Sequence, residues 1–193
     1  MAVRMFHQPE RLSYERFLIR QLDVHKLKTE VEIRSMMNAS PTKRIVCPHC
    51  GAVNRVPTER SPLAAKCGCC HQALFDRRPL EVDEAGFELH LRANDIPLLL
   101  DVWAPWCGPC RTMAPQFERA ALSLEPDVRL IKLNADEAPN ISVRLGVRGI
   151  PAMFLINRGA VVAQTAGAMS ADAIVRWARD SLPTLPISKG DSL

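Results

Sequence analysis

The sequence predicts an α/β sandwich domain in the second half of the chain, preceded by a small module held together by metal. From Leu80 onward, apolar runs typical of strands alternate with segments typical of helices. Five of the seven cysteines lie upstream, and four of them form two C-x-x-C pairs in a polar stretch that contains prolines. A third pair directly follows an apolar run at 98–103, so a predicted strand leads into it. The 193 residues therefore divide into a small module and a larger domain.

The predicted elements of the larger domain follow one another in a regular order. They are a strand at 80–82, a helix to 93, a strand at 98–103, a helix at 107–124, a strand at 128–134, a helix at 140–145, hairpin strands at 152–157 and 160–165, and a helix to 180. Asp83 and Ser170 are N-cap residues for two of the helices, and Gly146 ends a third. Arg158 and Gly159 form the hairpin turn. Pro115 lies inside a helix, where it removes a backbone hydrogen bond and predicts a kink.

The two upstream cysteine pairs have the spacing of a zinc site. Cys47 and Cys50 are separated from Cys67 and Cys70 by sixteen residues, and four thiolates so arranged suit tetrahedral zinc. A segment of about thirty residues cannot bury enough apolar surface to fold alone. We therefore expect one zinc ion per chain, a zinc ribbon over 41–77, and no ordered ribbon without the metal.

Three further side chains near the two pairs leave the ligand set open. Cys69, His49 and His71 are all close enough in sequence to replace one of the four cysteines. We expect Cys69 to be a bystander thiol and the first to oxidise if it is exposed. Disulfides in place of zinc are the weaker alternative in a reducing compartment. If the ribbon thiols do oxidise, loss of zinc would loosen the ribbon.

The composition argues for a protein of the cytoplasm that is not embedded in a membrane. Apolar runs such as 98–100 and 150–156 are far too short to span a bilayer, and no signal-peptide core follows Met1. In the reducing cytosol, C-x-x-C pairs indicate metal binding or redox chemistry.

Charge is distributed unevenly along the chain. Residues 41–80 carry seven Lys and Arg but two Asp and Glu, whereas residues 81–193 carry eleven against fourteen. Such a basic segment could attract acidic partners or nucleic acid, but without interleaved aromatic residues nucleic acid is disfavoured. A solvated surface around the metal site is the simpler interpretation.

Two terminal segments complete the predicted organisation. Residues 1–40 have apolar residues at helical spacing, which predicts an amphipathic helix, although Met36 and Met37 allow the alternative of a later translation start. Residues 38–42 are a linker by composition. The larger domain covers 78–182, and residues 183–193 form a loose tail.

A series of residues in the larger domain resembles the thioredoxin family. In chain order the series is Asp101, Trp103, Trp106-Cys107-Gly108-Pro109-Cys110, Pro115, Lys132, Gly149-Ile150-Pro151, Gly159 and Gly167. With the four cysteines upstream, the sequence is similar to the zinc-containing thioredoxin 2 type over residues 45–181. The resemblance implies a thioredoxin fold, which is a mixed central sheet with helices on both faces, preceded by a small zinc ribbon.

The pair Cys107 and Cys110 has the features of a redox-active disulfide. Disulfide exchange needs a thiolate with a lowered pKa and an accessible sulfur, and Cys107 is placed at a helix N-terminus, which favours negative charge. Cys110, one turn later and more buried, would attack the mixed disulfide and release the reduced product. Gly108 and Pro109 lie between them, without the histidine found there in oxidants of this fold, so the resemblance implies a reductant. Metal binding by this pair is disfavoured because no second ligand pair is left.

Asp101 is an acidic residue in an otherwise apolar strand. Burial should raise its pKa and suit it to take the proton of Cys110 as the general base. Lys132 resembles the family lysine that pairs with this acid, and an exposed cation at a strand end is an equal alternative. Trp103 is expected in the core.

The resemblance also implies a substrate-binding surface around the dithiol. Ile150 and Pro151 resemble the cis-proline turn of the family, whose backbone pairs with an extended substrate segment. The residues implied for this surface are Trp106, Gly149, Ile150, Pro151 and Gly167. Ala152 stands where thioredoxins usually have threonine, which would affect substrate preference more than chemistry.

Together with the resemblance, these residues predict a protein-disulfide reductase that works by thiol-disulfide exchange. Its partners would be disulfide-containing proteins and an NADPH-dependent thioredoxin reductase that recharges the dithiol, and we expect a monomer. A zinc-dependent redox chaperone or binding module is the alternative, and nucleic-acid binding by the ribbon is a third. The complete set of Asp101, Cys107, Cys110 and Pro151 favours the reductase.

Overall fold

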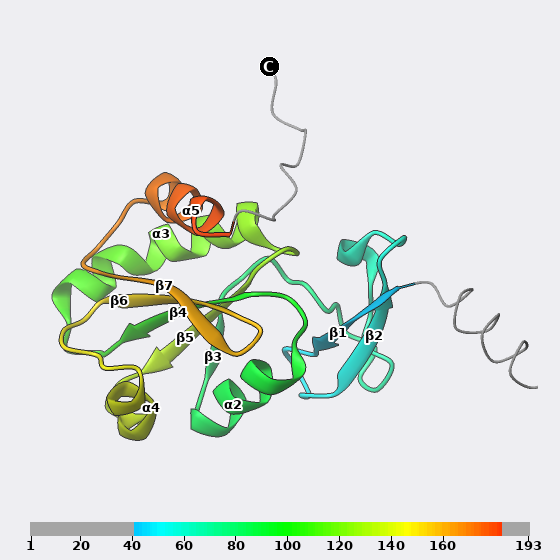
Figure 1. Ribbon diagram of the computed structural model, residues 1–193, viewed down its shortest axis with the longest axis horizontal. Coiled ribbons are helices and arrows are strands. Elements are labelled where there is room, and N and C mark those ends of the chain that lie inside the picture. Colours follow the sequence, from blue (N-terminus) through cyan, green and yellow to red (C-terminus); the bar gives the residue numbers. More distant parts are fainter. Residues whose placement is uncertain (1–40, 183–193) are drawn as a thin grey trace, which may run out of the picture. The chain divides into compact units, whose positions relative to one another are not determined.

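The central element of the fold is a five-stranded mixed sheet (Figure 1). The computed structural model describes residues 41–182, so the expectations for 1–40 and for the tail at 183–193 lie outside the described residues. The strands are β3 (Leu80–Val82), β4 (Leu98–Trp103), β5 (Arg129–Asn134), β6 (Ala152–Asn157) and β7 (Ala160–Ala166). Their order is β3-β5-β4-β6-β7; β3, β5 and β4 pair parallel, and β6 pairs antiparallel with β4 on one side and with β7 on the other. The predicted mixed sheet is confirmed.

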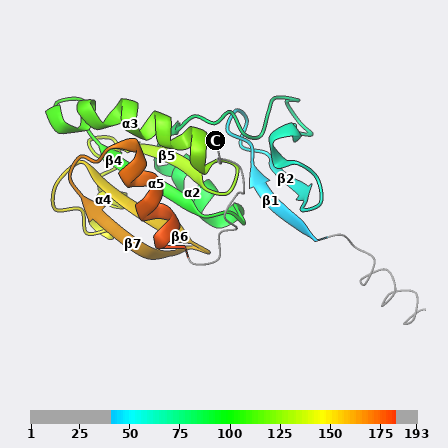
Figure 2. The ribbon, with the colours of Figure 1, turned by 90° about the horizontal axis from the view of Figure 1, so that it is seen from above.

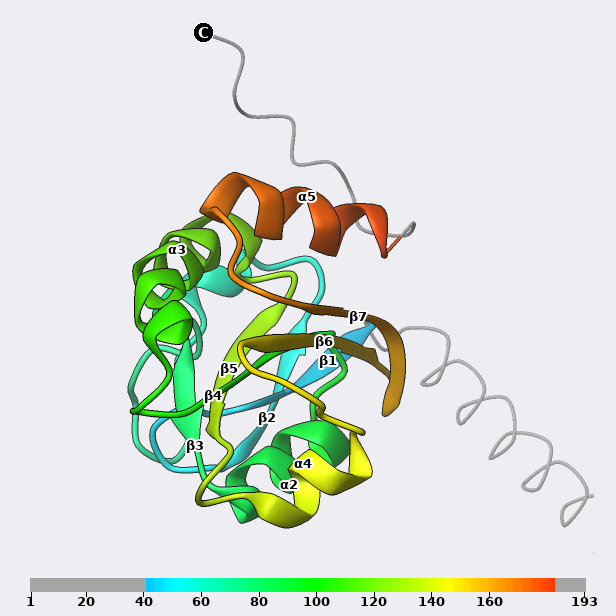
Figure 3. The same cartoon turned by 90° about the vertical axis from the view of Figure 1, so that its left-hand side faces the viewer.

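Two helices cover each face of this sheet, as predicted. The helices α3 (Gly108–Leu124) and α5 (Ala171–Asp180) lie on one face, and α2 (Glu84–Ala93) and α4 (Pro139–Arg144) on the other (Figures 1 and 3). Successive strand residues point to opposite faces. Leu99 of β4 accordingly packs in the cluster that includes Phe117 of α3, whereas Leu98 and Leu100 pack in the cluster that includes Phe87 of α2. These two clusters form the core of the domain.

The predicted caps and turns of the domain are present. Asp83 and Ser170 each accept a hydrogen bond from a backbone amide of the helix they cap, at 2.7 and 3.4 Å. Gly146 follows the end of α4 with a φ of +67°, and Arg158 and Gly159 form the β6–β7 turn with φ values of +51° and +79°. Because glycine has no Cβ, it adopts this left-handed conformation at little cost. Within residues 41–182, no helix combines the length and apolarity needed to cross a bilayer.

The ribbon contains a β-hairpin that the sequence analysis did not predict. Strands β1 (Thr42–Val46) and β2 (Val53–Pro57) pair antiparallel, and a short 3-10 helix, η1 (Pro62–Ala64), follows. Thr42, predicted to belong to the linker, is instead the first residue of β1. The hairpin buries Ile45 and Val56 in a small core with Leu74, and this apolar contact favours strand over linker.

The ribbon packs against the larger domain through polar contacts that join distant parts of the chain. Asn94, at the end of α2, accepts a hydrogen bond from the backbone amide of Val46 at 2.8 Å, and Asp95 forms a 2.8 Å ion pair with Arg44. The side chain of Asn94 also bonds His90 at 2.7 Å. Burial, followed by the charge of Arg129, lowers the pKa of His90 to about 4, so its ring is neutral near pH 7. Figure 2 shows the β1–β2 hairpin as a sheet separate from the central one.

A buried ion pair makes a second connection between the two modules. Arg129 donates to Glu125 at 2.8 Å and to the carbonyl oxygen of Leu74 at 2.6 Å. The guanidinium carbon also lies 4.9 Å from the centre of the Phe75 ring, while Glu125 accepts a hydrogen bond from the backbone amide of Arg77 at 2.8 Å. Both charged side chains are almost completely buried. The segment that follows the second cysteine pair is therefore bound to the larger domain by charge as well as by packing.

Candidate active site and metal centre

The pair Cys107 and Cys110 forms a disulfide in the structure, with an S–S distance of 2.02 Å. Cys107 is the N-cap of α3, and its Sγ accepts a hydrogen bond from the backbone amide of Cys110 at 3.2 Å. Gly108 and Pro109 are the first two residues of the helix. The free amide groups and the dipole of this helix end favour a thiolate on Cys107 once the disulfide is reduced.

The expected difference in burial between the two cysteines is absent from the disulfide form. Cys107 is 4% exposed and Cys110 is 3% exposed. The prediction of an accessible sulfur on Cys107 and a more buried one on Cys110 is therefore wrong for the oxidised protein. The reason is the surrounding cluster, in which Ala104, Trp103 and Ile150 pack against both cysteines.

Asp101 lies in the middle of β4 with only 2% of its surface exposed. Burial raises the pKa of its carboxyl from 3.8 to about 7, and the positive charge of Lys132 opposes this increase. Its Oδ1 atom has no hydrogen-bond partner among residues 41–182. The carboxyl is therefore able to hold or release a proton near neutral pH, as a general base requires.

Lys132 acts on Asp101 through its charge, without an ion pair or a hydrogen bond between the two side chains. The two residues are Cα partners in the β4–β5 ladder. The Nζ atom of Lys132, however, lies 4.5 Å from the centre of the Trp103 ring and 4.0 Å from Glu81. The ammonium thus takes a place over an aromatic face, where the ring quadrupole attracts it. Trp103, predicted in the core, is only partly buried.

The rim of the dithiol contains an exposed tryptophan and the proline turn. Trp106 is 68% exposed, and its indole Nε1 donates to Asp136 at 2.9 Å. The Ile150–Pro151 peptide bond is cis, and Ile150 packs in the cluster that contains both cysteines. The amide of Gly167 donates to the carbonyl oxygen of Pro151 at 2.9 Å. The structure therefore brings these predicted surface residues to the dithiol from three separate segments.

Sequence reasoning did not identify Asp136 as part of this rim. The only signal was its position two residues after the end of β5, where polar residues at the edge of a sheet are common functional groups. Gly149, which was identified, is exposed and has nothing within 4 Å of the position that a Cβ would take. An extended peptide could therefore approach the backbone beside it without a steric conflict.

The four predicted zinc ligands converge on one point. The Sγ atoms of Cys47, Cys50, Cys67 and Cys70 all lie within 4.8 Å of one another. Two of the sulfur–sulfur distances are 3.6 Å, close to the edge of about 3.8 Å that a tetrahedron with zinc–sulfur bonds of about 2.3 Å requires. The backbone amide of His49 donates a hydrogen bond to Sγ of Cys47 at 3.4 Å, and that of Cys69 donates to Sγ of Cys67 at 3.3 Å. Four thiolates with amide donors behind them fit a structural zinc ion.

The other candidate ligands lie outside this group. His49 pairs with Asp76 at 2.8 Å through Nε2 and is not a member of the cysteine cluster found among the described residues. Cys69 and His71 are exposed and do not belong to the cluster found among the described residues. The structure therefore favours the four cysteines of the two C-x-x-C pairs as the metal ligands.

Comparisons with known proteins agree with this geometry. The family model described as Thioredoxin matches residues 78–180, and the model described as Thioredoxin 2, N-terminal matches residues 46–72. The chain belongs to the thioredoxin family. It is a thioredoxin-type protein-disulfide oxidoreductase that carries a zinc-ribbon segment at the N-terminal side of its thioredoxin domain.

Individual relatives support the same assignment. Thioredoxin C-3 of Corynebacterium nephridii is 41% identical over 133 residues, which cover 69% of this chain and 91% of that protein. The thioredoxin of Haemophilus influenzae is 42% identical over 90 residues, which cover 47% and 84%. A mutant thioredoxin of Halobacterium salinarum has a similar structure, with a TM-score of 0.51 and 29% identity over 57% of this chain and 96% of that one. The longer match to Thioredoxin C-3 exceeds the length of a thioredoxin domain alone.

Proposed function

We propose that this thioredoxin-family protein is a reductase of protein disulfides that uses Cys107 as its nucleophile. The observation that carries the proposal is the position of the Cys107–Cys110 disulfide at the N-terminus of α3, in the same domain as a buried acid whose pKa is about 7. A helix N-terminus stabilises the thiolate of Cys107 in the reduced form, and the buried acid can accept the proton of Cys110.

The reaction proceeds in two exchange steps. The Cys107 thiolate attacks one sulfur of the substrate disulfide, forms a mixed disulfide, and displaces the other substrate sulfur as a thiolate. Cys110 then loses its proton to Asp101 and attacks Sγ of Cys107, which closes the Cys107–Cys110 disulfide and releases the second substrate thiol. The substrate gains two electrons and the dithiol loses two. An extended substrate segment would lie beside Trp106 and the Ile150–Pro151 turn.

The same proposal includes a zinc ion held by the four ribbon cysteines. Zinc bound there would supply a structural crosslink, because a closed site of four thiolates leaves no open position for chemistry. Burial raises the pKa of Cys47 to about 12, whereas backbone amides, that of Cys70 first, lower the pKa of Cys67 to about 6. Metal binding would displace the protons that remain.

We further infer that the protein is cytoplasmic and that a thioredoxin reductase reduces its Cys107–Cys110 disulfide with electrons from NADPH. The support is chemical: four cysteines clustered as metal ligands and not paired in disulfides are typical of proteins in reducing surroundings. After each turnover the Cys107–Cys110 disulfide must accept two electrons, and the family relation makes an NADPH-dependent reductase the expected donor.

The test is NADPH-coupled reduction of insulin by the zinc-loaded chain and thioredoxin reductase. Cys107→Ser should abolish turnover, whereas Cys69→Ser, which removes an exposed thiol outside the metal cluster, should leave it unchanged. Cys110→Ser should accumulate a mixed disulfide between Cys107 and insulin, visible by non-reducing electrophoresis and mass spectrometry. A parent protein that binds zinc and folds but does not turn over would refute the reductase and favour a binding module.

A further inference from the structure

The ribbon has a concave groove that neither the dithiol nor the metal centre uses. Its volume is about 580 Å³, within the range of sites that hold ligands. The groove is formed by β2, the turn after it, η1 and the start of the second cysteine pair. The lining residues are Asn54, Arg55, Val56, Pro57, Arg60, Ser61, Ala64, Ala65, Lys66 and Gly68. It is therefore built entirely from the ribbon.

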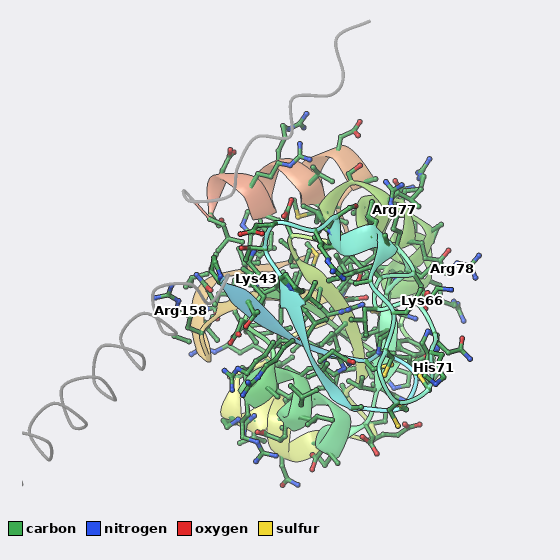
Figure 4. The ribbon with its side chains drawn as sticks, turned by 90° about the vertical axis from the view of Figure 1, so that its right-hand side faces the viewer. Lys43, Lys66, His71, Arg77, Arg78 and Arg158 are labelled. Carbon is green, nitrogen blue, oxygen red and sulfur yellow. A yellow bond between two sulfur atoms is a disulfide. The ribbon has the colours of Figure 1, made fainter. Side chains whose placement is uncertain are left out.

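Every charged side chain that lines the groove is positive. Arg55 comes from β2, Arg60 from the turn after it, and Lys66 from the segment after η1, so three separate stretches bring cations to one hollow. Figure 4 looks at this side of the molecule, with Lys66 among the labelled basic side chains. Glu59, next to Arg60 in the sequence, is not among the lining residues. Like charges brought together in a concave surface repel one another and raise the local attraction for an anion.

The three cations have no anionic partner within residues 41–182, unlike other basic residues of the chain. Arg44 pairs with Asp95 and Arg129 pairs with Glu125, whereas the side chains of Arg55, Arg60 and Lys66 form no ion pair or hydrogen bond in the described part of the chain. All three are exposed. Their charges are therefore available to a ligand from outside.

The walls of the groove are held in place before any ligand binds. Asn54 accepts a hydrogen bond from the amide of Gly68 at 2.8 Å and donates to the carbonyl oxygen of Ala52 at 2.8 Å. This side chain connects β2 to the second cysteine pair within the lining of the groove. Gly68 follows Cys67, one of the four clustered cysteines, so zinc would fix the same wall. A preformed site costs less ordering entropy on binding.

The chemistry of the lining selects a polypeptide over a nucleic acid. Proteins that bind single-stranded nucleic acid provide aromatic side chains for the bases to stack on, and no aromatic residue lines this groove. Small apolar side chains, Val56, Pro57, Ala64 and Ala65, occupy the positions between the cations. Such a surface suits the alternating carboxylate and aliphatic side chains of an acidic peptide.

We propose that this groove binds an acidic segment of a partner polypeptide, with Arg55, Arg60 and Lys66 as the recognition residues. The binding does not depend on the dithiol, because the groove and the active site share no residue. An acidic stretch in a disulfide-containing substrate would be captured by the ribbon while its disulfide is presented to the catalytic domain. The ribbon then contributes substrate selection to the protein.

The test measures binding of a fluorescein-labelled peptide, free of cysteine and rich in Glu and Ala, to the zinc-loaded full chain. A peptide in which Gln replaces Glu and a single-stranded oligonucleotide serve as comparison probes, all at physiological salt. The groove variant is Arg55→Gln, Arg60→Gln and Lys66→Gln together. The matched control, with the same change in net charge, is Arg92→Gln, Arg158→Gln and Arg176→Gln, three exposed arginines outside the groove.

We expect the groove variant to bind the acidic peptide about tenfold or more weakly, the combined effect of three lost ion pairs, with zinc content unchanged. The control variant should bind within about twofold of the parent, since general attraction is largely screened at this salt. Equal losses in the two variants, or no binding of the acidic peptide by the parent, would overturn the proposal. Tighter binding of the oligonucleotide, lost in the groove variant, would overturn the peptide as the occupant. Insulin reduction by the same proteins reports separately on the dithiol.

Discussion

Replacing Asp101 by Asn should stabilise the protein, and by an amount that grows with pH. Asn has nearly the same shape as a protonated Asp, so the substitution removes the ionisation of the buried carboxyl and little else. The pKa of this group is 3.8 in the unfolded chain and about 7 in the folded one. Folding therefore favours the protonated form by on the order of 4 kcal/mol, the free energy of that pKa difference.

The direction in which the stability changes with pH follows from proton binding. Between pH 3.8 and about pH 7 the folded state holds this proton and the unfolded state has released it. The stability that the protonated carboxyl provides is thus fully present below pH 3.8, is lost progressively as pH rises, and is gone above about pH 7. The Asn side chain does not ionise, so the Asp101→Asn variant does not lose this stability as pH rises. Its free energy of unfolding should exceed that of the parent by up to about 4 kcal/mol above pH 7.

The assay is urea unfolding of the disulfide forms at a series of pH values from about 4 to 8.5, followed by far-UV circular dichroism. The difference between Asp101→Asn and the parent should rise across this range and level off above about pH 7. Asp180→Asn, which removes an exposed carboxyl, should change the free energy by no more than about 0.5 kcal/mol at any pH. A difference for Asp101→Asn that is flat with pH would show that the carboxyl ionises normally in the folded protein.

Three further predictions concern the surroundings of these sites. Glu125→Gln leaves the buried Arg129 without its counter-charge and should destabilise the chain by about 3 kcal/mol in urea, and Arg129→Met on that background should recover part of the loss. Lys132→Met should raise the pKa of Asp101 above about 7, seen as a higher midpoint in an NMR titration of the carboxyl; a lower midpoint would contradict the charge effect. Removing zinc with a chelator should speed hydrogen exchange in β1 and β2 while β4 and β5 stay protected; unchanged exchange in β1 and β2 would show that the ribbon folds without metal.

Local patterns in the sequence account for most of the fold. The cap at Asp83, the glycine after α4 and the turn at Arg158 and Gly159 each depend on residues only a few positions apart. The same holds for the spacing within each cysteine pair, which predicted the ligand set that the structure brings together. The β1–β2 hairpin was missed because its apolar residues are few, and they become a core only when Leu74 and Phe75 fold back over them.

The type of each site is readable from the sequence: a C-x-x-C dithiol after a strand, an acid within that apolar strand, and four cysteines at zinc spacing. Which side chains meet across long sequence separations depends on how the elements pack in the folded chain. Arg129 binds Leu74 across 55 residues of sequence, Asn94 binds Val46 across 48, and the ammonium of Lys132 lies over Trp103. Three basic residues of the ribbon likewise share a groove only after its segments fold together. Hydrogen bonds and ion pairs need distances of a few ångströms, and the packing of the elements sets those distances.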